Sequence, residues 1–209
     1  MKLYDFALAP NPRRVRIFLA EKVIAVPTVQ VNLRETDQLK PEFLAINPFA
    51  TVPVLELDDG RHIAETIAIC RYFEELHPEP RLFGADPYER AVVEEWQRHI
   101  EWDGFLAVGE AFRNGLPGFK GRALTGPVGY EQIPDLVERG KQRTMRFFEL
   151  LDRRLGDREF IAGPRYTVAD ITALVAHDFG TRAKILVTDA MPNLKRWYAT
   201  VSARPSATA

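Results

Sequence analysis

The chain has 209 residues, of which 46% are hydrophobic and 27% are charged, and its formal net charge is −1. This length and apolar content fit one large globular domain or two small ones. A charge this close to zero creates no overall positive field that would attract nucleic acid or an anionic membrane. No apolar run approaches the ~20 residues that span a bilayer.

The N-terminal residues lack the long apolar centre of a signal peptide, so we expect a cytoplasmic protein. The single cysteine, Cys70, excludes a disulfide within the chain. Four scattered histidines include no His-x-x-x-His pair, which argues against a catalytic zinc site. No metal is therefore expected.

The chain begins with alternating strand and helix patterns. Residues 2–6 predict a first strand, and Asn11 followed by Pro12 predicts a helix with Asn11 as its N-cap. Residues 28–33 alternate apolar and polar side chains, which is typical of a strand. Residues 41–46 indicate a short helix.

A hairpin and a helix follow. Asp58-Asp59-Gly60 is a turn signal between strands expected at residues 54–57 and 61–63. A helix over residues 66–76 closes this part of the chain, which gives the order β-α-β-α-β-β-α.

Three prolines and one glycine between His77 and Pro87 break both patterns and predict a domain boundary. We expect a first domain at residues 1–78 and a second domain at residues 88–209. Strand patterns are nearly absent from the second domain. Its expected helices cover residues 88–112, 133–155, 168–181 and 193–202. Thr167 and Asp170 have the spacing of a capping box before the third of these helices.

Pro53 lies just before the strand expected at residues 54–57. Proline removes a hydrogen-bond donor from a strand, so its position there is unusual. A cis Val52–Pro53 bond would explain it and would leave the backbone N–H and C=O of Val52 free to pair with an extended peptide. A plain edge-strand proline is the alternative.

Glu65 and Thr66 directly precede a predicted helix. The unpaired N–H groups and positive dipole end of a helix N-terminus suit a carboxylate. The Thr66 hydroxyl can add a donor, and Glu65 can pair with an amine, so together they could hold an α-amino-acid group. Simple N-capping is the alternative.

Segments in both halves of the chain resemble the cytosolic glutathione transferase family. In the first half they are Lys2-Leu-Tyr4, Pro10-Asn-Pro-Arg-Arg-Val-Arg16, Asn47-Pro48, Val52-Pro-Val-Leu55, Glu65-Thr-Ile-Ala-Ile69 and Arg71-Tyr-Phe73. In the second half they are Phe160-Ile-Ala-Gly163, Thr167-Val-Ala-Asp-Ile171 and Pro192-Asn-Leu-Lys-Arg-Trp197. The resemblance implies an α/β thioredoxin-like N-terminal domain, an all-α helical-bundle C-terminal domain, a homodimer, and glutathione as co-substrate.

The resemblance also assigns glutathione contacts. Val52 would pair its backbone with the cysteinyl part of glutathione, and Pro53 would be the cis proline. Glu65 and Thr66 would hold the γ-glutamyl end.

Two further residues are candidates for glutathione binding. Lys40 could reach the glycyl carboxylate. Many family members carry a lysine just before the Val-Pro pair, and Thr51 occupies that position here.

The thiol-activating position departs from the common family pattern. The family uses a Tyr, Ser or Cys near the end of the first strand or the start of the first helix, where this chain has Ala9 and Pro10. The nearest donor is Asn11, whose amide could donate to the sulfur while the helix N-terminus favours the anion. Bacterial nu-class enzymes resemble this arrangement, although they usually carry a threonine in place of Ala9. Asn11 is the catalytic candidate, and a purely N-capping Asn11 is the alternative.

Other polar residues receive structural interpretations. Tyr4 is expected to pack in the core, and Cys70 to be a buried thiol. Arg13, Arg14 and Arg16 are expected to be solvated helix residues.

The electrophile is expected to bind where the two domains meet. The candidate lining residues are aromatic: Phe6, Trp102, Phe105, Phe112, Phe119 and Phe179. Their number favours a flat, apolar co-substrate.

These observations predict an enzyme, a glutathione transferase that conjugates the glutathione thiolate to an apolar electrophile in detoxification. One alternative is a glutathione-dependent disulfide reductase or peroxidase, suggested by the nu-like Pro10-Asn11 pair. Another is a non-catalytic binding module, suggested by the absence of a hydroxyl at Ala9.

Overall fold

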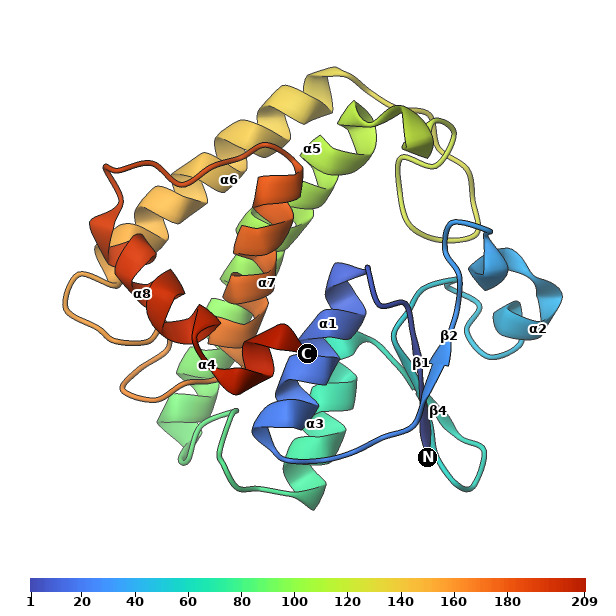
Figure 1. Ribbon diagram of the computed structural model, residues 1–209, viewed down its shortest axis with the longest axis horizontal. Coiled ribbons are helices and arrows are strands. Elements are labelled where there is room, and N and C mark those ends of the chain that lie inside the picture. The colour runs from blue at the N-terminus through green and yellow to red at the C-terminus, as the bar shows by residue number, and fades with distance from the viewer. The chain divides into compact units, whose positions relative to one another are not determined.

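The computed structural model describes all 209 residues, which form two compact units (Figure 1). The first unit contains Met1–Pro80, together with Leu124–Gly129 and Ala209. The second unit contains Arg81–Ala123 and Tyr130–Thr208. None of the helices has the length and apolar character needed to cross a membrane.

The first unit is built on a mixed sheet of four strands in the order β2-β1-β3-β4. The strands are β1 (Lys2–Asp5), β2 (Thr28–Gln30), β3 (Val54–Glu56) and β4 (His62–Ala64). Strand β2 is parallel to β1, whereas β3 is antiparallel to both β1 and β4. The hairpin predicted at Asp58-Asp59-Gly60 is confirmed, and Gly60 has the positive φ of 83° that the turn needs.

Helices complete the first unit. They are α1 (Pro10–Glu21), the 3₁₀ turn η1 (Asp37–Leu39), α2 (Pro41–Leu44) and α3 (Thr66–Leu76). Figure 1 shows α1 and α3 side by side, and the two helices contact each other. The predicted order β-α-β-α-β-β-α and the thioredoxin-like fold are confirmed.

The predicted start of the first helix is wrong. Helix α1 begins at Pro10 with Ala9 in the N-cap position, so Asn11 lies inside the first turn and is not the cap. Both prolines fit this turn, because the first N–H groups of a helix have no acceptor within it and proline lacks that N–H. The sequence pattern alone could not show which proline comes first in the helix.

The second unit is entirely helical. Its elements are α4 (Pro87–His99), the π-helical η2 (Ile100–Leu106), α5 (Ala107–Gly115), η3 (Pro117–Phe119), α6 (Asp135–Arg154), α7 (Val168–Arg182), α8 (Pro192–Ser202) and η4 (Pro205–Thr208). The single helix expected over residues 88–112 is therefore three segments, with the π-helical turn in the middle. The other three predicted helices are confirmed.

The core of the second unit includes a buried carboxylate at the start of α7. Asp170 is fully buried, and its Oδ1 accepts from the backbone N–H of Ile161 at 3.0 Å and from the Trp197 indole at 2.9 Å. Its Oδ2 accepts from the N–H and hydroxyl of Thr167, which confirms the predicted capping box. Burial raises the pKa of the Asp170 carboxyl, while these four donors act in the opposite direction. One side chain thereby joins α7, α8 and the loop before α7.

Helices α5 and α6 approach closely at Gly140, and Figure 1 shows them running side by side. A Cβ added at Gly140 would lie 2.5 Å from the carbonyl oxygen of Ala107 and 2.8 Å from the amide nitrogen of Ala111. Both atoms belong to the backbone and cannot turn aside as a side chain would. The absence of a side chain at Gly140 is therefore what permits this helix pair.

We predict that Gly140→Ala lowers the free energy of unfolding by about 1–3 kcal/mol, because the added methyl forces the two helices apart. Gly109→Ala is the matched control, since Gly109 lies in α5 and a Cβ there meets nothing within 4 Å. The control should be neutral or stabilising by up to ~1 kcal/mol through helix propensity. Urea unfolding of both variants measures the difference, and equal stabilities would contradict the packing argument.

Candidate functional site

The turn before β3 has the geometry expected from the sequence. The Val52–Pro53 bond is cis, and Ala50 has a positive φ of 53°. The Asn47 side chain, 1% exposed, donates from Nδ2 to the Thr51 carbonyl oxygen at 2.9 Å and to the Thr51 hydroxyl at 3.1 Å. Its Oδ1 accepts from the Phe49 N–H at 3.1 Å. Asn47 therefore holds the whole turn that leads into Val52.

Val52 connects this turn to the core of the first unit. Its side chain is buried in an apolar cluster with Tyr4 and Val54, and Ala9 packs against the same cluster. Its backbone lies outside the β-ladder, which begins at Val54. The cis-proline turn and the start of α1 thus share one apolar support.

The start of α3 is held in an unusual conformation. Glu65 has φ 88° and ψ 126°, a region that costs a non-glycine residue about 1–3 kcal/mol. No side chain caps the helix, so the N-capping alternative for this pair is wrong. The Glu65 side chain is exposed, and Thr66 is 3% exposed as the first residue of the helix. The N–H groups of the first turn therefore have no side-chain acceptor, an arrangement that suits a bound anion.

Asn11 lies in the first turn of α1. Its Oδ1 accepts a hydrogen bond of 3.0 Å from Nη1 of Arg14, and Arg14 is only 3% exposed. The expectation that Arg14 is solvated is therefore wrong. Because the Asn11 oxygen is used in this way, the amide nitrogen is the end of the side chain that can donate to a ligand.

Tyr4 has the structural role that the sequence indicated. Its hydroxyl donates to Oε2 of Glu56 at 2.7 Å, and its ring packs edge-on against Phe43. Burial, followed by the hydrogen bond to Glu56, raises the pKa of Tyr4. Its hydroxyl proton is therefore committed to a carboxylate within the fold.

The loop between β1 and α1 is fixed by a closed network. Asp5, 2% exposed, pairs with Nη1 of Arg16 at 2.6 Å and accepts from Nε2 of Gln30 at 3.1 Å. The Gln30 Oε1 accepts from the N–H of Ala7, and Arg16 Nη2 donates to the Ala7 carbonyl, both at 3.0 Å. The prediction that Arg16 is a solvated helix residue is wrong, because the buried carboxylate of Asp5 requires a cationic partner.

Lys40 lies at the end of η1 with an exposed side chain. Its Nζ pairs with Oδ1 of Asp37 at 2.6 Å, and this contact raises the pKa of Lys40 and lowers that of Asp37. Thr51 is fixed through Asn47, as described above. The Lys40 side chain is 61% exposed, so its ammonium lies where a ligand carboxylate can also reach it.

Most of the aromatic candidates form one group in the second unit. Phe112 lies 5.4 Å from Phe119 and 5.0 Å from Phe179, and Phe105 lies 5.7 Å from Phe179, measured between ring centroids. Trp102 stands apart from these contacts and is 61% exposed. Phe6, in the first unit, packs against the apolar cluster around Val52.

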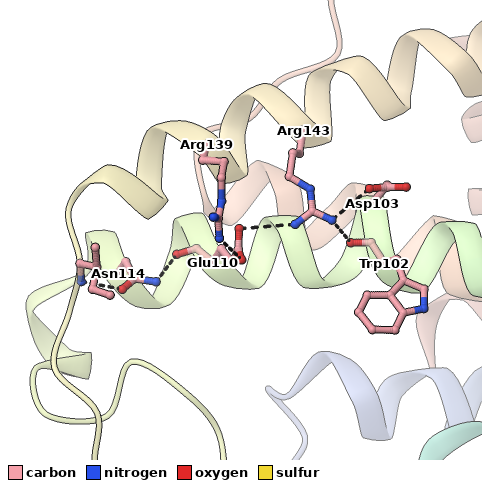
Figure 2. A network of polar contacts seen from close by, with 7 residues as sticks. Trp102, Asp103, Glu110, Asn114, Arg139 and Arg143 are labelled. Atoms are coloured by element: carbon pink, nitrogen blue, oxygen red, sulfur yellow. Dashed lines mark hydrogen bonds and ion pairs between the residues drawn. The ribbon is translucent and has the colours of Figure 1, made fainter.

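A polar network fixes the backbone that carries Trp102. Arg143 of α6 donates to the Trp102 carbonyl oxygen and to Asp103, both at 3.0 Å, and Glu110 pairs with Arg139 at 2.8 Å. Figure 2 shows these contacts between α6 and the continuous segment formed by η2 and α5. The indole of Trp102 is directed away from α6. The side chain is therefore free to contact other groups while its backbone is held.

A four-stranded mixed sheet with a cis-proline turn, combined with an all-helical unit, defines a thioredoxin-like domain followed by a helical domain. Residues 9–76 match the family model described as "Glutathione S-transferase, N-terminal domain", and residues 116–205 match "Glutathione S-transferase, C-terminal domain". Glutathione S-transferase 2 of Saccharomyces cerevisiae is 36% identical over 209 residues, which cover 99% of this chain and 87% of the yeast protein.

Solved structures agree with this match. A glutathione S-transferase domain-containing protein of Marinobacter aquaeolei superimposes with a TM-score of 0.91 at 40% identity and 99% coverage of both chains. Gtt2 of Saccharomyces cerevisiae gives a TM-score of 0.90 at 36% identity, covering 99% of this chain and 98% of that one. The chain belongs to the glutathione S-transferase family, as its sequence motifs indicated.

Sequence reasoning missed the residues that support the site. In the sequence, Asn47 stands out only as part of a family-like motif. No sequence pattern predicts the buried network of Asp5, Arg16 and Gln30. The signal that could have indicated this role is Asn47 directly before Pro48, four residues ahead of Thr51. An asparagine side chain in a turn commonly bonds the backbone of that turn.

We predict that Asn47→Ala weakens glutathione binding at least about tenfold, because the turn that presents Val52 loses three hydrogen bonds. Asn193→Ala, a change of the same type in the second unit, should leave binding unchanged. Calorimetric titration with glutathione measures both. Wild-type affinity in Asn47→Ala would show that the turn does not need this side chain.

Proposed function

We propose that the protein is a glutathione transferase that joins the glutathione thiolate to an electrophilic carbon of an apolar substrate. The observations that carry this proposal are the match to that family over 99% of this chain and the turn before β3, where the backbone of Val52 lies outside the β-ladder. Such a turn offers the backbone of Val52 to an extended peptide in the manner of an added strand.

Glutathione is held along its length in this proposal. The Val52 backbone pairs with the cysteinyl residue, and Glu65 and Thr66 at the start of α3 bind the ammonium and carboxylate of the γ-glutamyl end. The strain at Glu65 supports this assignment, since strained backbone persists at sites where the conformation is used. Lys40 binds the glycyl carboxylate, and Thr51 is a further glutathione contact.

Asn11 stabilises the thiolate. A free thiol has a pKa of about 8.5, and lowering it by about 2 units requires ~2.7 kcal/mol of preference for the anion. The Asn11 amide donates to the sulfur, and the N-terminus of α1 adds a favourable potential. The thiol proton leaves to solvent before the reaction.

The thiolate then attacks the electrophilic carbon with its electron pair. A new C–S bond forms, and a leaving group departs with its electrons or an activated double bond accepts them. The site contributes ionisation and positioning of the nucleophile. The exposed Trp102 and the group Phe105, Phe112, Phe119 and Phe179 are proposed to contact the apolar part of the electrophile, together with Phe6.

The wider role follows from this chemistry. Conjugation makes an apolar electrophile polar and unreactive, so the proposal places the protein in detoxification in the cytoplasm. No metal takes part in the reaction.

We predict that bound glutathione has a thiol pKa about 2 units below that of free glutathione, and that Asn11→Ala raises it by about 1 to 2 units. The ultraviolet absorbance of the thiolate, followed from pH 5 to pH 10 with saturating glutathione, measures this. Because ionisation is nearly complete above the lowered pKa, the conjugation rate of the wild type should level off at a lower pH than that of the variant.

Other results assign other functions. Binding with an unshifted thiol pKa would exclude the transferase mechanism and leave a binding module. A lowered pKa with activity on a model disulfide, and none on aryl halides, would identify a disulfide reductase. A pKa that is equally low in Asn11→Ala would exclude Asn11 as the donor and leave the helix N-terminus or another donor.

The protein is also proposed to be a homodimer, with the helices over residues 88–112 and the end of the first domain in the interface. The exposed aromatic side chain of Tyr88, 78% exposed near the start of α4, supports this.

We predict that the wild type sediments with the mass of two chains and that Tyr88→Glu shifts it toward one chain. In the dimer, a glutamate at position 88 would be buried without a partner in an apolar interface. In the monomer it is favourable, because it lies in the first turn of α4. Leu186→Glu changes another exposed apolar residue, 60% exposed, and should remain dimeric. A monomeric wild type would contradict the proposal.

A further inference from the structure

Arg14 is almost completely buried although α1 carries four other polar side chains. It is 3% exposed, and its Nη1 donates to Oδ1 of Asn11 at 3.0 Å. The two residues are three positions apart, so they lie on the same face of α1. The contact therefore links a buried cation to the proposed thiol donor.

The chemistry of this pair decides which end of the Asn11 amide faces outward. The oxygen and nitrogen ends of an asparagine amide have nearly the same size but opposite roles, one accepting and one donating. A guanidinium has five N–H donors and no acceptor. Only the oxygen can therefore face Arg14, and the amide N–H₂ must point the other way.

We propose that Arg14 is a positioning residue that orients the Asn11 amide so that its N–H₂ donates to the glutathione thiolate. This inference rests on the proposed function, in which Asn11 stabilises that thiolate. Arg14 does not touch the sulfur and acts through Asn11 alone.

Two effects of Arg14 reinforce each other. Asparagine near a helix start can otherwise turn its oxygen toward neighbouring backbone N–H groups, and the guanidinium removes that alternative. A donor on the amide oxygen also polarises the amide and strengthens its N–H as a donor. Both effects lower the thiol pKa without adding any contact to glutathione.

The charge of Arg14 could also favour a thiolate directly, and Arg13 supplies a control for this. Arg13 lies in the same helical turn, but a residue two positions from Asn11 does not face it. Arg13→Met removes the same charge from the same turn and leaves the Arg14–Asn11 hydrogen bond in place.

The experiment measures the thiol pKa of bound glutathione by thiolate absorbance in the full-length variants. Arg14→Met should raise the pKa by about half of the 1 to 2 units that correspond to the whole Asn11 hydrogen bond. Arg13→Met should raise it by less. The kcat for conjugation near pH 6.5 should fall in Arg14→Met with little change in the KM for glutathione, because ionisation changes and binding does not.

Conservative variants separate orientation from stability. Lysine, like arginine, is only a donor and keeps the Asn11 oxygen facing it, so Arg14→Lys should retain the low pKa. Glutamine carries both a donor and an acceptor and can pair with either end of the amide, so Arg14→Gln should resemble Arg14→Met. If Arg14→Met does not fold, the contrast between the lysine and glutamine variants provides the test, with thermal unfolding as a check.

The double variant with Asn11→Ala completes the test. Arg14→Met should raise the pKa less when Asn11 is absent, because its effect passes through Asn11. An equal shift in both backgrounds, or no shift in Arg14→Met, overturns the inference and leaves the proposed function intact. A wild-type pKa equal to that of free glutathione overturns both.

Discussion

The carboxylate of Asp5 is the charge around which the first unit is organised. It is 2% exposed at the end of β1, and a buried carboxylate is costly unless it is paired and hydrogen-bonded. Arg16 of α1 and Gln30 of β2 meet this requirement, which brings three elements to one point. The same two side chains bond both backbone groups of Ala7, so the loop that leads into α1 is fixed by the pairing of one buried charge.

From this loop the chain reaches Ala9, a small residue without a side-chain donor at the start of α1. Ala9 packs against the apolar cluster that also holds Val52 and Tyr4. A methyl group fits that environment, whereas a hydroxyl placed there would need a partner. The same contact ties the start of α1 to the cis-proline turn, which Asn47 holds from the other side. The start of α1, which carries the proposed thiol donor, and the turn that carries Val52 are therefore supported by one core.

Local signals in the sequence predicted the fold well where the physical cause was itself local. The Asp58-Asp59-Gly60 turn, the Thr167–Asp170 capping box and the cis Val52–Pro53 bond each depend on a few neighbouring residues. Features that depend on distant partners were missed. Arg16 has the pattern of a solvated helix face, and only the placement of the buried Asp5 beside it shows why it is held there.

In the proposed mechanism an asparagine takes the place of the hydroxyl donor common in this family, and the free energies involved are large enough for that role. A helix N-terminus contributes about 0.3–1 kcal/mol to a nearby anion, and up to ~2 kcal/mol where the site is partly buried. A lowering of 2 pKa units needs ~2.7 kcal/mol, so the N-terminus of α1 is insufficient by itself. A hydrogen bond to a charged group contributes about 1.5–3 kcal/mol and supplies the remainder. That hydrogen bond requires the nitrogen end of the amide, and a donor-only partner such as Arg14 on the oxygen end secures it.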